Sequence, residues 1–351
     1  MSVFNGKKLT IDIYGESHAD KVGVSVKGFP HFRFDEKELK AFMARRKASG
    51  EVFSTSRIEA DEPIFSGVKN GETDGEFTAE ILNANRISKD YSALYGKPRP
   101  SHADYAWHLK DGALDFSGGG RFSARLTAPL CVVGGILKQY LKTRGIEIES
   151  YISSVGKASA ASYKDKPLSA EEIRKLRDDG VFPSLDKKER LVEEIKNAKS
   201  VGDSVGGTVE CVITGVKGVG DNLFSGLEGK IASLIYSVPA VKGVEFGDGF
   251  DLAKMRGSAA NDPLRIENGQ VKIITNRAGG INGGIANGNP ITLRVAFRPT
   301  PSISLPQLTV DLIKKENTEI IINGRHDACV AVRALPAVES AVAIAIADEI
   351  L

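Results

Sequence analysis

The sequence predicts one α+β domain, residues 1–351, with mainly antiparallel sheets. Three observations lead to this prediction. Short β-branched segments occur along the whole chain, helical segments separate only some of them, and no regular alternation of strand and helix is present. Regular alternation would favour a parallel sheet with crossover helices. The length is ample for a hydrophobic core and is compatible with a single large domain.

The expected strands are short, rich in β-branched residues and partly alternating in polarity. They are residues 8–14, 23–27, 77–82, 207–213, 271–275 and 291–297.

Capping patterns and apolar runs predict the helices. Asp35 with Glu38, and Ser169 with Glu172, each form a capping box before an apolar residue. Apolar runs predict buried helices at residues 124–141 and, at the C-terminus, 336–351. Residues 158–200 are rich in Lys and Glu, and we expect them to form a charged helical excursion from the domain.

The composition is that of an ordinary globular protein, with 41% apolar and 26% charged residues. A net charge of +2 is too small to indicate nucleic-acid binding. No apolar stretch has the length of a signal peptide core or a membrane span, so we expect a cytoplasmic protein without a membrane partner. Cys131, Cys211 and Cys329 are far apart, and no zinc-like His spacing occurs, so we expect neither disulfides nor a metal site.

Four glycine-punctuated or proline-punctuated runs place histidines and arginines on loops. They are residues 15–18, 99–105, 118–125 and 324–327, and they contain His18, His102 and His326. Glycine lets backbone amides approach a ligand, and Arg supplies a fixed cation. A lone His is more often structural than catalytic, but this shared context favours function for these three, whereas His31 and His108 are expected to be structural. The pattern indicates a site for a multiply anionic small molecule.

Two glycine clusters allow more than one interpretation. Residues 118–125 read Gly-Gly-Gly-Arg-Phe-Ser-Ala-Arg before an apolar helix, which favours an anion site over a flexible turn. The run does not match the dinucleotide-binding pattern. Residues 278–290 form the second cluster, for which a ligand-contacting loop is favoured over a plain connector.

In their order along the chain, these runs resemble the chorismate synthase family. The resemblance covers nearly the whole chain and also includes residues 90–93, 202–207, 239–250, 297–303 and 324–340. It implies a β-α-β sandwich with helices layered between mainly antiparallel sheets, assembled as a homotetramer.

The implied activity is that of a carbon-oxygen lyase in the shikimate pathway of aromatic amino acid biosynthesis. Members of the family convert 5-enolpyruvylshikimate 3-phosphate to chorismate and phosphate by a 1,4-elimination. They need reduced FMN, although no net redox change occurs. The sequence leaves open whether this chain reduces its own flavin with NADPH or depends on an external reductase.

The resemblance also implies residue roles by matching position. His102 would protonate or polarise the reduced flavin, His18 would move protons near the leaving phosphate, and Asp327 would assist deprotonation near flavin N5. Ser17 and Ser123 match hydroxyls of proton relays. The implied flavin contacts are Arg121, Phe122, Ser123, Pro239, Ala240, Gly283, Arg298, Pro299, Thr300, Pro301, Ser302 and Arg325.

Arginines are the expected substrate-binding groups, because guanidinium binds carboxylate and phosphate in a bidentate manner. They are Arg46, Arg57, Arg125 and Arg333. Val52 stands where the family commonly has an anion-binding Arg, and Arg57 is expected to compensate. Two rival classes stay open: a flavin oxidoreductase with net hydride transfer, and a protein that binds a phosphorylated ligand without turning it over.

Overall fold

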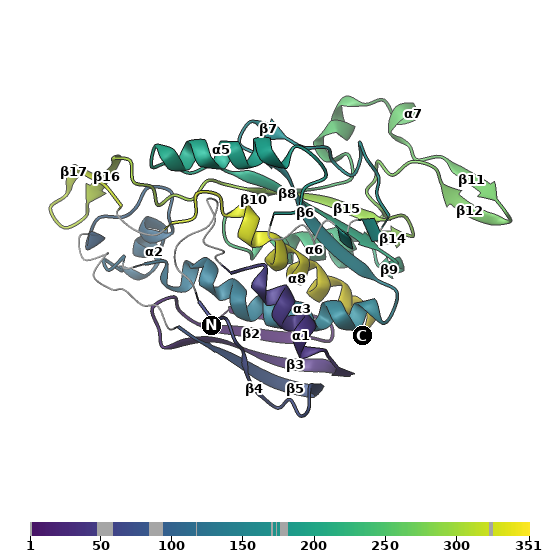
Figure 1. Ribbon diagram of the computed structural model, residues 1–351, viewed down its shortest axis with the longest axis horizontal. Helices are drawn as coiled ribbons and strands as arrows, with labels where there is room; N and C mark the ends of the chain where they lie inside the picture. Colours follow the sequence, from purple (N-terminus) through teal and green to yellow (C-terminus); the bar gives the residue numbers. More distant parts are fainter. Residues whose placement is uncertain are drawn as a thin grey trace.

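The computed structural model describes residues 2–47, 59–83, 94–116, 118–169, 171–172, 174–175, 182–322 and 326–351. Two five-stranded sheets enclose a layer of helices (Figure 1). The first sheet has the order β1-β2-β3-β5-β4. Its strands are β1 (Ser2–Asn5), β2 (Thr10–Gly15), β3 (Lys21–Arg33), β4 (Ile64–Ser66) and β5 (Glu72–Leu82).

The second large sheet has the order β10-β15-β8-β6-β7. Its strands are β6 (Glu147–Val155), β7 (Ala158–Ser159), β8 (Gly207–Thr214), β10 (Val241–Phe246) and β15 (Ile291–Phe297). Smaller sheets contain β9 (Lys217–Gly220) with β13 (Ile281–Asn282) and β14 (Ile285–Asn287), β11 (Leu264–Glu267) with β12 (Gln270–Ile273), and β16 (Gln307–Asp311) with β17 (Glu316–Ile320). All strand pairs in the described ranges are antiparallel, as the sequence predicts.

The helical layer contains α1 (Glu36–Ala44), α3 (Thr127–Lys142), α6 (Leu227–Tyr236) and α8 (Ala331–Ile350). Helix α3 packs on β3 of the first sheet and on α8, and α8 packs on β6 of the second sheet (Figure 1). Both helices are apolar around most of their circumference, which requires burial on all sides. A side chain at Gly134 would overlap Ser340, so this glycine permits the close approach of α3 and α8. The arrangement agrees with the expected sandwich.

Helices α2 (Asp104–Asp111), α5 (Lys188–Ser200) and α7 (Gly257–Ala260) lie outside this layer. In the region 158–200, Leu191 and Ile195 of α5 are buried and the helix packs on β6, so this part of the excursion is attached to the second sheet. The predicted capping box is present, because the Glu172 amide donates to Ser169 Oγ (3.2 Å) and the Ser169 amide donates to Glu172 Oε2 (2.8 Å).

The boundaries of the two buried helices differ from the prediction. Residues 124–126 form a 3₁₀ turn, and α3 begins only at Thr127. Helix α8 begins at Ala331 and contains Pro336, although the sequence predicts that the helix starts at this proline. Proline removes one backbone hydrogen bond inside a helix, but complete burial of the surrounding side chains holds the segment helical. Within the described ranges, no helix combines the length and apolarity needed to cross a bilayer.

A buried ionic cluster joins three elements of the core. Arg45 donates both terminal nitrogens to Glu339 of α8 (2.9 and 2.7 Å), and Lys138 of α3 lies 2.5 Å from the same carboxylate. Ser150 of β6 donates to it as well, at 2.7 Å. Glu339 is completely buried, so these contacts compensate for its loss of water. Cys131, Cys211 and Cys329 are buried free thiols, as expected.

Candidate active site

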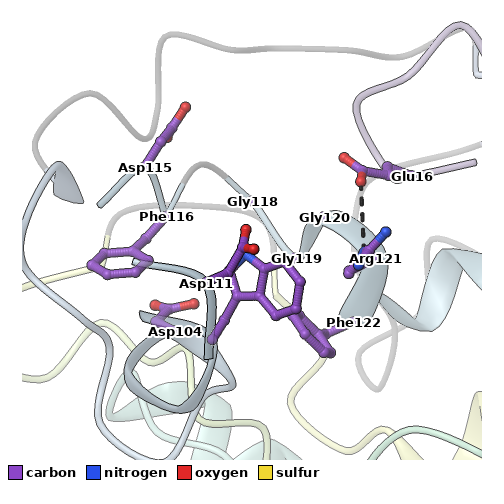
Figure 2. A pocket seen from close by; sticks show the side chains of 11 residues that line it. Glu16, Asp104, Asp111, Asp115, Phe116, Gly118, Gly119, Gly120, Arg121 and Phe122 are labelled. Atoms are coloured by element: carbon purple, nitrogen blue, oxygen red, sulfur yellow. Dashed lines mark ion pairs between the residues drawn. The ribbon is translucent and has the colours of Figure 1, made fainter. Parts of the chain in front are cut away.

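A pocket of about 400 Å³ lies beside the 118–122 loop and helix α2 (Figure 2). Its lining comes from several separate segments: Glu16, Asp104, Trp107, Asp111, Asp115, Phe116, Gly118, Gly119, Gly120, Arg121 and Phe122. Three of the four loop runs predicted from the sequence therefore contribute to this lining. Run 15–18 supplies Glu16, run 99–105 supplies Asp104, and run 118–125 supplies residues 118–122.

Gly118 lets the 118–122 loop approach His18. This glycine has a left-handed backbone (φ 61°), and a side chain at its position would overlap the imidazole of His18. The Ser17 amide donates to Gly120 O at 3.3 Å. Ser17 is buried, and its Oγ has no hydrogen-bond partner among the described residues. The loop thus fixes both members of the predicted Ser17–His18 pair.

An aromatic and cationic wall forms one side of the pocket. The guanidinium of Arg121 lies over the ring of Trp107, 4.9 Å from its centroid, and Phe122 meets the same ring edge-on at 5.5 Å. Arg121 and Glu16 point toward each other, with 3.9 Å between Nε and Oε1 (Figure 2). A half-exposed cation on a flat aromatic surface suits a planar ligand that carries negative charge.

The lining of this pocket is more acidic than the sequence suggested. Among the described lining residues, Glu16, Asp104, Asp111 and Asp115 are carboxylates, and Arg121 is the basic residue. The expected dense group of cations lies deeper in the protein and is largely paired with carboxylates.

Arg46 and Arg125 both bind the carboxylate of Asp61. Arg46 Nη1 lies 2.5 Å from Asp61 Oδ2, Arg125 Nη1 contacts Asp61 Oδ1, and all three side chains are buried. Further bonds from Arg46 to Thr127 (2.9 Å) and from Arg125 to Asn83 (2.7 Å) complete the cluster. Burial alone would raise the pKa of Asp61, but the two guanidinium groups lower it. Asp61 therefore accepts hydrogen bonds from Arg46 and Arg125, the two arginines that the sequence predicts to bind substrate.

A second, narrow cavity of about 30 Å³ adjoins this cluster. It is lined by Arg46, Ala124, Thr127, Val238, Pro239, Asp327, Val330, Arg333, Ala334 and Ala337. Arg333 donates from Nη1 to Asp327 Oδ2 (2.8 Å) and from Nε to the carbonyl of Arg46 (2.9 Å). Both side chains are partly exposed, at 21% for Arg333 and 15% for Asp327. The fold therefore brings the predicted residues Arg46, Pro239, Asp327 and Arg333 together.

His102 belongs to a cluster of charged groups at the start of α2. Its Nδ1 lies 2.5 Å from Asp104 Oδ1, and Asp104 also accepts from Arg99 Nε at 2.7 Å. The guanidinium of Arg99 donates to Gly118 O at 2.5 Å, which connects this cluster to the 118–122 loop.

His326 lies close enough to Arg99 and His102 for their charges to oppose its protonation. Burial is the main reason that its pKa is lowered, and Asp327 acts in the opposite direction. The Nε2 of His326 is buried without a hydrogen-bond partner among the described residues. His326 is therefore a buried imidazole whose surroundings disfavour its charged form.

The 298–302 segment joins the same region. The Arg298 amide donates to Ala240 O (3.0 Å), and its Nη1 donates to the carbonyl of Ser101, next to His102. Ser204 donates to the carbonyl of Thr300 (2.7 Å), and Ser302 is buried. The contact with Ser101 joins the start of this segment to the His102 loop.

Some predicted positions are not part of this assembly. Gly283 lies in the turn between β13 and β14, and β14 is on the opposite side of the molecule from α2 (Figure 1). Ser123, by contrast, belongs to the site loop, where its Oγ accepts the amide of Arg125 at 3.1 Å. Arg57, Val52, Arg325 and the run 90–93 lie outside the described residues. Within the described ranges, no group of three His, Cys, Asp or Glu side chains is arranged to hold a metal ion.

A sandwich fold that gathers histidines, carboxylates and arginines around two cavities is typical of an enzyme active site. A family model described as chorismate synthase matches residues 9–351. The chain therefore belongs to the chorismate synthase family and is a carbon-oxygen lyase.

Individual relatives agree with this assignment. The chain is 44% identical over 351 residues to chorismate synthase of Thermococcus kodakarensis, covering 99% of this chain and 97% of that protein. It is 41% identical over 352 residues to the protein of the same description from Korarchaeum cryptofilum, covering 99% and 96% of the two chains. A solved structure titled "Crystal Structure of Chorismate Synthase" superposes with a TM-score of 0.73 at 25% identity, covering 98% of this chain and 92% of the other.

Proposed function

We propose that this chain converts 5-enolpyruvylshikimate 3-phosphate to chorismate and phosphate by a 1,4-elimination that requires reduced FMN. The observation that carries the proposal is spatial convergence. His18 lies against Gly118, and Arg99 donates to the carbonyl of Gly118. Asp104 joins Arg99 to His102. Residues from three separate runs therefore meet, and Asp327 of the fourth run lines the narrow cavity with Arg46 and Arg333.

The residues present fit a bound flavin nucleotide. The wall of Trp107, Arg121 and Phe122 offers flat aromatic surface beside a cation, and the pocket volume lies in the range of small-molecule sites. Arg121 and Arg298 would hold the anionic part, and Ser17 Oγ, buried without a partner among the described residues, is available as a donor. When bound, reduced FMN would supply transient electron donation without net redox change. We extend the flavin contacts to Phe122, Ser123, Pro239, Ala240, the 298–302 segment and Arg325, as the resemblance implies.

The chain's own groups would bind the substrate and move protons. Asp327 is held by Arg333 and would accept the proton that is lost in the elimination. His18 would carry protons near the leaving phosphate, and His102 would donate a hydrogen bond or a proton to the flavin. Ser17 and Ser123 would serve as relays.

The positive charge that attracts the anionic substrate would come from the arginine cluster beneath the narrow cavity. Two guanidinium groups and one carboxylate give the cluster of Arg46, Arg125 and Asp61 a net charge of +1. Arg333 lines the cavity together with Arg46 and is paired with Asp327. We include Arg57 in the substrate-binding set because the resemblance implies it. Burial strengthens the attraction of this charge for a phosphate or carboxylate.

An anaerobic assay tests the proposal. With photoreduced FMN and substrate, we expect phosphate and chorismate in equal amounts while the absorbance of reduced flavin persists at the end of turnover. Stoichiometric flavin oxidation would indicate a flavin oxidoreductase instead, and binding without phosphate release would indicate a ligand-binding protein. The same assay with oxidised FMN and NADPH decides whether the chain reduces its own flavin.

The proposal includes a cytoplasmic homotetramer, which the family resemblance implies. Sedimentation velocity of the purified protein tests the assembly, and a monomer at assay concentration would contradict it.

A further inference from the structure

Asp104 holds His102 through one nitrogen of its ring. The loop before α2 turns at Ser101, whose backbone is left-handed (φ 57°), and the His102 amide donates to Arg99 O at 3.2 Å. This turn places His102 Nδ1 at 2.5 Å from Asp104 Oδ1, at the first residue of α2. Both side chains are largely buried, at 15% and 5% exposure.

Arg99 keeps the Asp104 carboxylate ionised. Arg99 donates its Nε to Oδ2 (2.7 Å), its Nη2 to Oδ1 (2.8 Å) and its backbone amide to Oδ2 (2.9 Å). Burial opposes ionisation, but hydrogen bonds from His102 and Arg99 lower the pKa of Asp104 to about 2. At neutral pH this group can only accept hydrogen bonds.

The ionised state of Asp104 determines which ring nitrogen of His102 carries the proton. A short contact between Nδ1 and an ionised carboxylate requires that Nδ1 carries the proton. The Nη2 of Arg99 also lies 3.2 Å from Nδ1, but both atoms are donors in this state, so this contact is not a hydrogen bond. Nε2 is then the nitrogen that can exchange a proton.

We propose that Asp104 is a positioning residue, which fixes His102 as the Nδ1–H tautomer and directs its Nε2 to the proton transfer of the reaction. The proposal rests on the proposed function of His102. The charged and titratable groups that face this imidazole are Arg99 and Asp104 from its own loop and helix, and His326 from the segment before α8, with Asp327 beyond it. Arg298 approaches through the carbonyl of Ser101.

The wild-type protein without any ligand gives the first test. In an imidazole ¹⁵N spectrum, with the His102 signals identified by their loss in His102→Gln, we expect the neutral ring to carry its proton on Nδ1 and none on Nε2. A proton on Nε2 in the wild type would overturn the proposal, and this measurement does not depend on the folding of an Asp104 variant.

Asp104→Asn gives the second test. We expect the fixed tautomer to be lost and kcat to fall at least about tenfold with a smaller change in KM. Asp35→Asn is the matched control. Asp35 also begins a helix, where its Oδ1 accepts the Lys37 amide at 2.7 Å, and it is remote from the imidazole, so we expect wild-type turnover and an unchanged tautomer.

The results separate this proposal from the proposed function. Reduced turnover in Asp104→Asn with an unchanged His102 tautomer would overturn the positioning role, and the proposed reaction would stand. Wild-type turnover in His102→Gln would overturn the proposed role of His102 and the catalytic consequence of Asp104 with it.

Discussion

Arg46 and Asp61 form a buried ion pair, with 2.5 Å between Nη1 and Oδ2, beneath the narrow cavity of the candidate site. Asp61 adopts a left-handed backbone (φ 50°) and binds Arg125 with its other oxygen. One carboxylate therefore organises two of the arginines that the sequence predicts as substrate-binding groups.

Removing that carboxylate should destabilise the fold. We expect Asp61→Ala to lower the free energy of unfolding by roughly 3–5 kcal/mol, because two buried guanidinium groups lose their counter-ion. Asp61→Asn should cost less, since Asn tolerates the left-handed conformation and keeps one acceptor oxygen. Urea unfolding of both variants measures the difference. Equal stability of Asp61→Ala and wild type would contradict the assigned role.

The buried carboxylates should make the protein sensitive to acid. Burial alone would raise the pKa of Glu339, but Arg45 and Lys138 lower it from its ordinary value of 4.5 to about 2. A lowered folded-state pKa stabilises the native state above the unfolded-state value, and this stabilisation is lost as pH falls. We expect the free energy of unfolding to decrease between about pH 4.5 and 2, the interval between these two values. Glu339→Gln should be less stable at neutral pH and show a shallower decrease, and an unchanged slope would count against this explanation.

The fold could be predicted from the sequence where the signal is local. Residues 291–297 alternate and match β15, and Asp35 caps α1 by accepting the amides of Lys37 and Glu38. The predicted start of α8 at Pro336 is wrong, because the burial that keeps this proline helical comes from distant elements.

The candidate site could also be predicted only where the sequence signal is local. His18, His102 and Asp327 stand in recognisable runs, but the partners of Asp61 are 15 and 64 residues away in the sequence, and no local pattern marks them. The role of Asp104 had a usable signal, since a carboxylate two residues after His102 at a helix start can reach Nδ1. Whether Arg125 is open or paired depends on Asp61, and therefore on the tertiary structure.

Trp107 should report flavin binding directly. It is the single tryptophan of the chain and lines the pocket beneath Arg121. We expect titration with FMN to quench its fluorescence to saturation. Arg121→Gln should weaken binding by roughly tenfold to a hundredfold, the value of a hydrogen bond to a charged group. An Arg144→Gln variant, whose guanidinium lies over Tyr140 on another part of the protein, serves as control. Fluorescence that does not respond to FMN would place the flavin elsewhere.

His102 and Asp327 should be required for turnover but not for folding. We expect His102→Ala and Asp327→Ala each to lower kcat by roughly a hundredfold or more, the usual contribution of general acid–base groups. Circular dichroism and thermal unfolding should remain close to wild type for His102→Ala, because Asp104 keeps its hydrogen bonds from Arg99. Wild-type-like turnover of both variants would defeat the assignment of these roles.

The most direct test of the central claim is a structure of the complex with FMN and 5-enolpyruvylshikimate 3-phosphate. The account predicts that the flavin lies against Trp107 and Arg121 and that the substrate reaches both His102 and Asp327. A complex with both molecules bound away from these four side chains would contradict it.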